Sequence, residues 1–333
     1  MLLIIFARLN GGLTMNIREL RNMFPALSRT VYGKQLVYFD NAATAQRSQS
    51  VIDKWTQLTI GANANIHRAV YKLAVDATDE YESTRDAVKE YINAAAREEI
   101  VFTSGTTGSI NLVAFSFGET FINEGDEIIV SEAEHHSDIV PWQMLCQRKG
   151  AVLRVLHVDE DGHLNLEELK SLLNPKTRIV AVTQISNVLG ILNPVKEIVS
   201  VCHSIGCPVL IDGAQGMVHE GVDVQDVDCD FYAFSGHKLY AATGTGVLYG
   251  KRKWLDQMVP YQGGGEMIAT VRFSGTTYAP LPEKFEAGTQ NINAIPTLEP
   301  TIEMLKLMKD KELLNAQEAV SQYLFHALTS NPR

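Results

Sequence analysis

A lysine and an aspartate that follow neighbouring apolar runs have the clearest chemical meaning. Asp212 ends the run PVLID, and Lys238 follows the next apolar run, within FSGHKLY. If both runs are parallel strands, both side chains reach the sheet edge where ligands bind in open α/β folds. A lysine among Ser, Gly, His and aromatic residues is poorly solvated. Poor solvation lowers the pKa of the amine and gives a neutral nucleophile that forms imines with carbonyl compounds.

This pair meets the requirements of pyridoxal 5'-phosphate. The lysine would hold the aldehyde of the cofactor, and the aspartate would keep the ring nitrogen protonated so that the ring accepts electrons. A nearby opposite charge stabilises the charged form strongly enough to decide such a protonation state. Each residue alone also has a structural interpretation, because Asp212 could cap a turn or helix and Lys238 could be a surface lysine.

Donors for a phosphate group are expected from two loops. Thr106 and Thr107 lie between a predicted strand and a predicted helix, where the first backbone N–H groups point outward. Ser235 and His237 are close to Lys238 and are further candidates. A threonine at a helix start is also commonly an N-cap, so these residues are informative mainly as a group.

Three more polar residues follow predicted strands and are candidates for the same pocket. His135 comes after the run that ends at Ser131 and is expected to lie flat on the cofactor ring. Asn187 and Gln215 are expected to hydrogen-bond the ring hydroxyl. A lone histidine is more often structural, but a group of polar residues at several strand ends favours a functional site.

The alternation of short apolar runs with helical periods predicts the fold that positions these residues. Runs that are apolar on both faces indicate a sheet covered on both sides, and helices between them indicate a mainly parallel sheet with right-handed crossovers. The predicted strands are 99–103, 127–131, 152–158, 178–183, 208–212, 231–235 and 246–250. Helices are predicted over 75–95, 107–120, 137–149, 165–173 and 194–204, an extended excursion over 261–275, and two helical periods over 297–329.

Length and composition exclude several protein classes. The 333 residues suit two domains, or one large α/β domain with a smaller companion, and 45% hydrophobic content excludes wholesale disorder. A net charge of −10 disfavours general binding to nucleic acid or to an anionic membrane. The first apolar run, MLLIIFA, is too short to span a bilayer and lacks the order of a signal peptide. We therefore expect residues 1–14 to be an upstream extension, with Met15 as the alternative start.

The cysteines indicate a reducing, cytoplasmic compartment. The chain has four, and so few make a disulfide framework improbable. Cys202 and Cys207 enclose a histidine, but no second Cys/His pair completes a zinc pattern, so burial is the favoured interpretation and no metal is expected. Gly244-Thr245-Gly246 does not predict a dinucleotide site, because these glycines precede a strand instead of linking a strand to a helix.

Taken together, the motifs resemble the SUF-type cysteine desulfurases, which include selenocysteine lyases and belong to the class V aminotransferases of fold-type I. The resemblance covers nearly everything from Met15 to the end. It is carried by YFDNAATAQ, NIHRAVY, FTSGTTGSINLVA, EAEHHSDIVPWQ, ISNVLG, LIDGAQ, CDFYAFSGHKLY, GGGEMIATV and FEAGTQN. The resemblance implies an α/β fold with a mainly parallel central sheet flanked by helices, and a second, small α+β domain.

The resemblance also implies roles for single residues. Lys238 and His135 would be catalytic, the lysine carrying the cofactor and the histidine stacking on its ring. The cofactor would also contact Thr106, Thr107, Asn187, Asp212, Gln215, Ser235, His237 and, from the other subunit of a homodimer, Thr289. His67 would lie at the substrate entrance, near the partner chain, and Asn187 would also face the substrate. The family converts L-cysteine to L-alanine and passes the sulfur to an acceptor protein for iron–sulfur cluster assembly.

One departure from the family pattern concerns the chain end. The cysteine that accepts sulfur and the arginine that binds the substrate carboxylate belong to a C-terminal segment that would lie beyond Arg333. We therefore expect 15–32 to begin a small domain, 33–294 to form the cofactor domain, and 295–333 to start a truncated small domain with impaired activity. The alternatives are a selenocysteine lyase or other class V enzyme, and a non-catalytic remnant.

Overall fold

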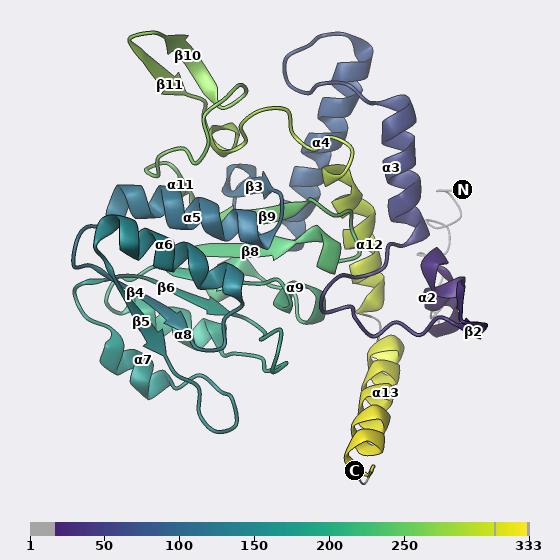
Figure 1. Ribbon diagram of the computed structural model, residues 1–333. Helices are drawn as coiled ribbons and strands as arrows, with labels where there is room; N and C mark the ends of the chain where they lie inside the picture. The colour runs from purple at the N-terminus through teal and green to yellow at the C-terminus, as the bar shows by residue number, and fades with distance from the viewer. Residues whose placement is uncertain (1–16, 310, 332–333) are drawn as a thin grey trace.

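A seven-stranded sheet forms the centre of the computed structural model, which describes residues 17–309 and 311–331 (Figure 1). Its strand order is β3-β9-β8-β7-β6-β4-β5. The strands are β3 (Ile100–Thr103), β4 (Glu127–Ser131), β5 (Val152–Leu156), β6 (Thr177–Thr183), β7 (Val209–Asp212), β8 (Phe231–Ser235) and β9 (Gly246–Gly250). Only β9 runs antiparallel to its neighbours in this sheet. The predicted, mainly parallel α/β sheet is confirmed.

Helices cover both faces of the sheet. One face packs against α5 (Thr106–Phe121) and α6 (Val140–Lys149), and the other against α4 (Lys72–Tyr91), α8 (Val195–His203) and α12 (Leu298–Met308). Strands β4, β8 and β9 are buried along their whole length, which explains why their sequences are apolar at consecutive positions. Burial of apolar surface on both faces therefore fixes the sheet.

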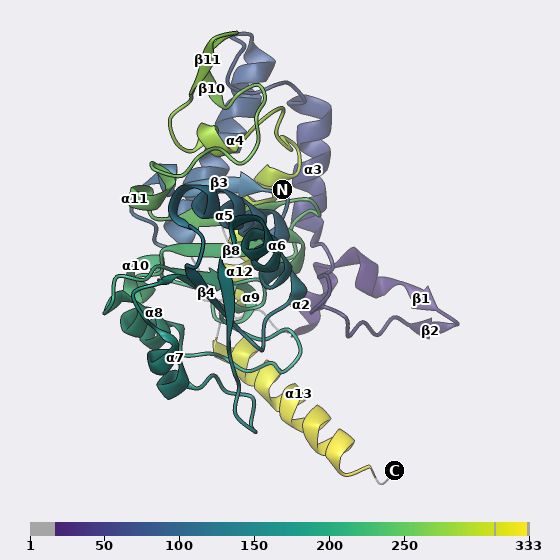
Figure 2. The same cartoon turned by 60° about the vertical axis from the view of Figure 1, so that its left-hand side comes forward.

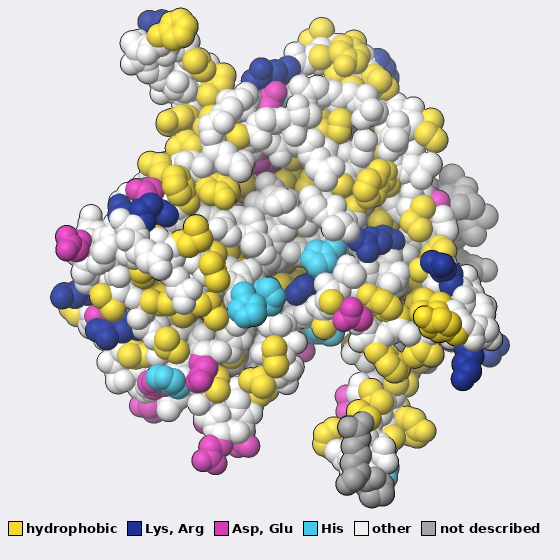
Figure 3. Space-filling model, viewed as in Figure 1, with side chains coloured by type: hydrophobic (Ala, Val, Ile, Leu, Met, Phe, Trp, Pro, Cys, Tyr) yellow, Lys and Arg dark blue, Asp and Glu magenta, His cyan; other side chains and the backbone are white. Residues whose placement is uncertain are grey.

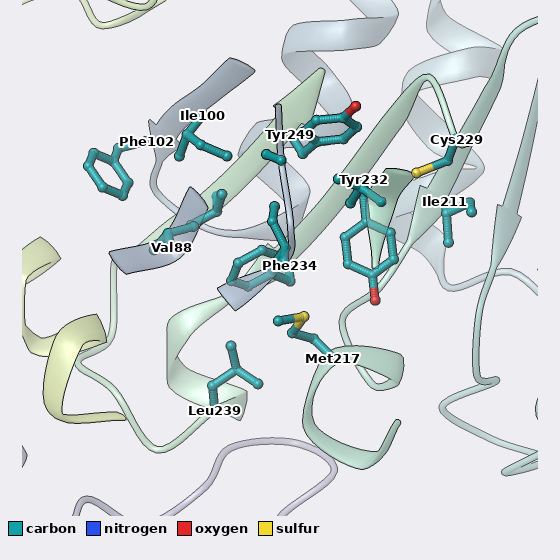
Figure 4. Close-up of a cluster of buried hydrophobic side chains, with 14 of the residues drawn as sticks. Val88, Ile100, Phe102, Ile211, Met217, Cys229, Tyr232, Phe234, Leu239 and Tyr249 are labelled. Atoms are coloured by element: carbon teal, nitrogen blue, oxygen red, sulfur yellow. The ribbon is translucent and has the colours of Figure 1, made fainter. Parts of the chain in front are cut away.

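The core on the α4 side lies directly beneath the candidate lysine loop. Figure 4 shows Tyr232 and Phe234 of β8 close to Met217 and Leu239. Leu239 directly follows Lys238 and is 2% exposed. The segment that carries Lys238 is therefore anchored by an apolar neighbour in the core.

Shorter elements complete the sheet domain. They are α7 (Leu166–Leu172), α9 (Gly216–His219), α10 (Val224–Val227), α11 (Arg252–Leu255) and the 3₁₀ turns η2 (Arg97–Glu99), η3 (His136–Asp138), η4 (Gly236–Lys238), η5 (Glu283–Phe285) and η6 (Ile295–Thr297). The predicted helix over 137–149 is thus divided into η3 and α6, with Pro141 in the first turn of α6.

The remaining elements belong neither to the seven-stranded sheet nor to the elements named above. They are α2 (Ile17–Asn22), η1 (Pro25–Ser28), β1 (Thr30–Val31), β2 (Lys34–Gln35), α3 (Gln49–Gly61), β10 (Ile268–Arg272), β11 (Gly275–Tyr278) and α13 (Lys311–Thr329). Figure 2 shows the β1–β2 hairpin and α13 projecting away from the sheet. Residues 1–14 and Met15, where we expect an extension and an alternative start, lie outside the described residues.

The long surface helix predicted over 75–95 is α4, but its boundaries differ. It begins at Lys72 and ends at Tyr91. Asn93 has a φ of 55°, in the left-handed region that asparagine tolerates better than most residues, and this conformation ends the helix. The domain boundaries expected near residues 32 and 294 stay predictions.

Candidate active site

A cavity of about 530 Å³ opens where β3, β4, β6, β7 and β8 end. It is lined by Asp40, Ala42, Ala43, Thr106, Thr107, His135, Ser137, Thr183, Ile185, Asn187, Asp212, Ala214, Gln215, Ser235, His237 and Lys238. Figure 3 shows histidine side chains beside a basic side chain near the middle of this face. The sheet therefore brings together every predicted site residue except His67 and Thr289.

Burial controls the charge of the two central groups. Asp212 is 3% exposed, and its burial raises the pKa of the carboxyl group despite a hydrogen bond from the backbone N–H of Ala214 at 2.8 Å. Burial also lowers the pKa of the Lys238 amine, against the opposing attraction of Asp212. Loss of hydration thus outweighs mutual attraction in both groups, and in Lys238 it favours the neutral amine, which is the nucleophilic form.

The loop after β4 fixes the orientation of His135. The backbone N–H of Ser137 donates to Nδ1 of His135 at 3.1 Å, and the Ser137 hydroxyl lies 2.7 Å from the same atom. Because Nδ1 accepts the backbone N–H, the neutral ring carries its proton on Nε2. Partial burial and the charge of Lys238 lower the pKa of His135, which favours this neutral form.

The N-terminus of α5 lies at the cavity, together with the residues that the sequence predicts as donors for a phosphate group. The backbone N–H and hydroxyl of Thr106 lie 2.7 Å and 2.8 Å from Oγ of Ser235, which joins α5 to the end of β8. The first turn of a helix offers backbone donors and a positive dipole end to an anion. Thr106, Thr107, Ser235 and His237 therefore surround one end of the cavity.

Gly246 allows this end of the cavity to form. A Cβ atom placed on Gly246 would lie 2.3 Å from Cα of Gly105. Gly105 itself has a φ of 145° and precedes α5. Close approach of β9 to the backbone before α5 thus explains why residue 246 is a glycine. Gly246 belongs to the motif Gly244-Thr245-Gly246, which did not predict a dinucleotide site.

The cavity also contains residues of the segment 38–46, which the sequence alone does not assign to the site. Asp40, Ala42 and Ala43 line the cavity, and the carbonyl of Ala42 accepts from Nε2 of Gln215 at 2.9 Å. The signal that could have found them is YFDNAATAQ, a motif that carries the family resemblance. This segment contacts the sheet edge from a distant part of the sequence, so local patterning could not place it.

Two predicted residues do not line the cavity. His67 has a φ of 65°, and its Nε2 lies 3.1 Å from Oε1 of Glu82 on α4. Thr289 is exposed in the segment before η6. Both were expected near a second subunit, so their proposed roles depend on a contact between chains.

Neither cysteines nor a metal centre contribute to the cavity among the described residues. Cys202, Cys207 and Cys229 are buried, Cys146 is half-buried, and none lines the cavity. Burial raises the pKa of Cys202 to about 12. The described ranges contain no group of three or more His, Cys, Asp or Glu side chains arranged to hold a metal ion. None of their helices is both long and apolar enough to cross a bilayer.

A second cavity, of about 570 Å³, lies between α4, α8 and the end of α12. Lys196 and Lys309 line it together with Glu197, Glu220 and Asp223. No strand-end carboxylate faces a buried lysine there, so the chemistry points to the smaller cavity.

Comparison with known proteins identifies the family. The family model for class-V aminotransferases matches residues 37–333. A cysteine desulfurase of Pectobacterium carotovorum is 47% identical over 317 residues, which cover 95% of this chain and 78% of the relative. The chain belongs to the class-V aminotransferase family. A cysteine desulfurase of Synechococcus elongatus is 50% identical over 282 residues, 85% of this chain but 45% of that longer protein.

Solved structures agree with the class V fold. The cysteine desulfurase CsdA of Escherichia coli, solved in an S-sulfonic acid form, has a TM-score of 0.86 at 39% identity and covers 96% of this chain and 79% of its own. The apo cysteine desulfurase of Thermococcus onnurineus has a TM-score of 0.83 at 35% identity, covering 89% and 72%. The expected fold-type I architecture is therefore confirmed.

The cofactor of this class V chain is pyridoxal 5'-phosphate, and the cavity fits it. A buried lysine, a strand-end aspartate and a helix N-terminus with hydroxyl groups line one cavity. They match the aldehyde, the ring nitrogen and the phosphate of the cofactor.

Proposed function

We propose that this chain is a pyridoxal phosphate-dependent cysteine desulfurase that uses the cavity at the ends of β3, β4, β6, β7 and β8. L-cysteine gives up its sulfur atom to a thiol, R–SH, so that the products are L-alanine and the persulfide R–S–SH. The observation that carries the proposal is that Lys238 and Asp212 line one cavity in a chain whose relatives are cysteine desulfurases.

The residues of the chain have distinct tasks in this proposal. Lys238 holds the cofactor aldehyde covalently and moves a proton with its amine. Asp212 holds positive charge at the ring nitrogen, and His135 stacks on the ring and carries a proton on Nε2. Thr106, Thr107, Ser235 and His237 bind the phosphate, and Asn187 and Gln215 face the ring hydroxyl and the substrate.

The bound cofactor supplies an aldehyde that reacts with amines and a ring that withdraws electrons from the substrate carbon atoms. The lowered pKa values of Lys238 and His135 support this assignment. Each shift favours the neutral form, and a neutral amine can attack a carbonyl group while a neutral imidazole can accept a proton. The sulfur-accepting thiol is not assigned to any of the four cysteines, because none lines the cavity.

Three further expectations complete the proposal. The enzyme acts as a cytoplasmic homodimer in which Thr289 of one subunit contacts the phosphate held by the other. His67 lies at the substrate entrance of this dimer. An acceptor protein receives the sulfur for iron–sulfur cluster assembly, and the motifs favour the SUF type within the family.

Product analysis tests the proposal. Purified chain loaded with pyridoxal phosphate is incubated with L-cysteine and a thiol reductant, and we expect L-alanine and sulfide in equal amounts. Lys238→Ala should abolish both products, whereas Lys196→Ala, at an exposed lysine, should leave them unchanged. Pyruvate as the main product would indicate elimination and mercaptopyruvate would indicate transamination, and either result would contradict the proposal. Faster release of selenide from selenocysteine would favour a selenocysteine lyase.

A further inference from the structure

Two carboxyl groups are buried in the segment that follows β4, behind the wall of the cavity. Glu134 is 8% exposed and Asp138 is 0% exposed. Oε1 of Glu134 accepts hydrogen bonds from the hydroxyl of Ser131 and, at 2.8 Å, from the backbone N–H of Thr183. Oδ1 of Asp138 accepts from the indole N–H of Trp142 at 2.8 Å. One oxygen of each carboxyl group is therefore satisfied.

The second oxygens of this pair have no donor. Oε2 of Glu134 and Oδ2 of Asp138 are both buried without a hydrogen-bond partner, although the two carboxyl groups are in contact with one another. Carboxylate oxygens only accept, so two ionised groups in this position would repel each other and leave two buried acceptors unpaired. One proton between them would supply the missing donor.

The charged surroundings of the pair favour this proton. The charge of Asp212 on β7, also buried, acts on both carboxyl groups, and Lys238 attracts Asp212. Burial and the charge of Asp212 raise the pKa of Glu134 to about 8, although the contact with Asp138 opposes this shift. Burial and the charges of Glu134 and Asp212 raise the pKa of Asp138 well above its usual range. The pair thus behaves as one unit that keeps a proton at neutral pH.

We propose that Glu134 and Asp138 share one proton and that this hydrogen bond positions His135. The two carboxyl groups flank His135 along the chain, and Ser137, which orients the His135 ring, lies between it and Asp138. The shared proton also limits the pair to one negative charge beside Asp212. The effect on His135 rests on the proposed function, whereas the shared proton does not.

Amide substitutions test the shared proton, because an amide brings its own donor. Asp138→Asn can donate to Glu134, and Glu134→Gln can donate to Asp138, so each single variant should fold without needing the proton. In the double variant two NH₂ groups would face each other. We expect the double variant to lose more stability than the two single variants together, so the two stability changes should not add.

The pH dependence of unfolding measures the proton directly. The folded wild-type chain keeps a proton that the unfolded chain loses above its ordinary carboxyl pKa, so its stability falls as the pH rises from 5 to 8. We expect the unfolding equilibrium constant of the wild type to increase about tenfold per pH unit relative to Asp138→Asn in this window. Asp161→Asn, at an exposed loop carboxylate, is the matched control and should retain the wild-type slope.

Infrared spectroscopy gives a second measurement, which needs no cofactor. The wild-type chain at pH 7 should show the C=O band of a protonated carboxylic acid, which Asp138→Asn should lack and Asp161→Asn should retain. Absence of the band in the wild type, or equal pH slopes for the wild type and Asp138→Asn, would overturn the shared proton.

The effect on His135 is read in the chain loaded with pyridoxal phosphate. Asp138→Ala should shift the visible band of the bound cofactor, and Asp138→Asn should restore it. A band that does not respond to Asp138→Ala would overturn the positioning role. Failure of the proposed function itself would instead appear as loss of the cofactor band in the wild type, with the infrared result unaffected.

Discussion

At the residue scale, the cavity shifts the pKa values of its ionisable groups in the direction that favours their neutral forms. Burial raises the pKa of Asp212 and lowers the pKa values of Lys238, His135 and His237. A neutral amine and a neutral imidazole are the forms that attack carbonyl groups and accept protons. The aspartate is the exception, because its task requires the charged form, and a positive ring nitrogen would stabilise that charge.

Replacement of Asp212 by asparagine should therefore separate stability from activity. The pKa of Asp212 is raised in the folded chain, so the protonated residue contributes stability at low pH. This contribution is lost as the pH rises through the folded-state pKa of Asp212. The cofactor-free Asp212→Asn chain should unfold at a higher temperature than the wild type at pH 7.5. Its turnover of L-cysteine should fall about 10²–10³-fold, since one electrostatic stabiliser is removed. Turnover equal to the wild type would contradict the assigned role.

The lowered pKa of His135 predicts the acid limb of the pH profile. Because its pKa lies below the ordinary value of 6.5, the neutral ring persists at pH 7 and becomes protonated only in more acidic solution. Turnover should therefore decline below pH 6.5, and His135→Gln should lower it about 10²–10⁴-fold and remove this limb. A limb unchanged in His135→Gln would show that another group titrates.

The site residues predicted from the sequence are those that directly follow strands. Asp212 and Lys238 could be predicted because a strand and its end are visible in a local pattern, and both line the cavity. Asp40 and Ala42 could not, because only the folded chain brings their segment to the sheet edge. Thr289 could not be placed either, since its expected contact depends on a second subunit.

At the scale of elements, the phosphate end depends on contact between β9 and the backbone before α5. Gly246→Ala would place a Cβ atom 2.3 Å from Cα of Gly105, and backbone cannot move aside as a flexible side chain can. We expect at least about a tenfold weaker binding of pyridoxal phosphate and a loss of about 1–3 kcal/mol in stability. Gly263→Ala meets open space and should bind the cofactor normally. Equal affinities in a titration of the two variants would contradict this packing argument.

A buried ion pair joins α4 to the segment before α12. Nη1 and Nη2 of Arg85 donate to the Glu286 carboxylate at 2.7 Å and 2.9 Å, and the backbone N–H of Phe102 donates to it at 2.7 Å. Both side chains are almost fully buried. The pair therefore connects α4, β3 and the segment that carries Thr289.

Removal of the Glu286 carboxylate should be costly, because it leaves the buried Arg85 paired with Glu82 and leaves the buried backbone N–H of Phe102 without its acceptor. Glu286→Ala is expected to lower the free energy of unfolding by about 3–5 kcal/mol. Asp76→Ala, which breaks the exposed pair with Lys72 on α4, should change it by less than about 0.5 kcal/mol. Denaturant titrations of the two variants measure the difference, and similar losses would contradict the account of the buried pair.

The strands could be predicted well because they are buried on both faces and therefore apolar at consecutive positions. Helix boundaries were less accurate, as α4 shows. The sequence periodicity extends past Tyr91, but the turn at Asn93 is a tertiary feature, since its side chain donates to Asp223 and the backbone N–H of Val224 donates to the carbonyl of Ile92. Local patterning contains no information on such contacts.

At the scale of the whole molecule, apolar side chains project from the β10–β11 hairpin. Val271 is 64% exposed and Phe273 is fully exposed in the single chain. Exposed apolar surface on a projecting hairpin supports the proposed homodimer. Thr289 lies outside the cavity of its own chain, as expected if it serves the cavity of a second one.

Mixed dimers test this sharing of residues. Thr289→Asp would repel the cofactor phosphate in the partner's site, and Lys238→Ala would remove the anchor in its own. Each variant alone should bind little pyridoxal phosphate. A dimer of one chain of each kind keeps one intact site, formed by Lys238 of the Thr289→Asp chain and Thr289 of the Lys238→Ala chain. Recovery of the cofactor band on mixing is expected, and no recovery in confirmed mixed dimers would contradict the shared site.

The central claim is that the Lys238 amine binds pyridoxal phosphate covalently, and borohydride reduction tests it most directly. The loaded chain is reduced, digested and analysed by mass spectrometry. The account predicts a pyridoxyl-phosphate adduct on the peptide that contains Lys238, in stoichiometric amount, and no stoichiometric adduct in Lys238→Ala. An adduct spread over surface lysines, or an unmodified Lys238 in a chain that retains the cofactor, would contradict it.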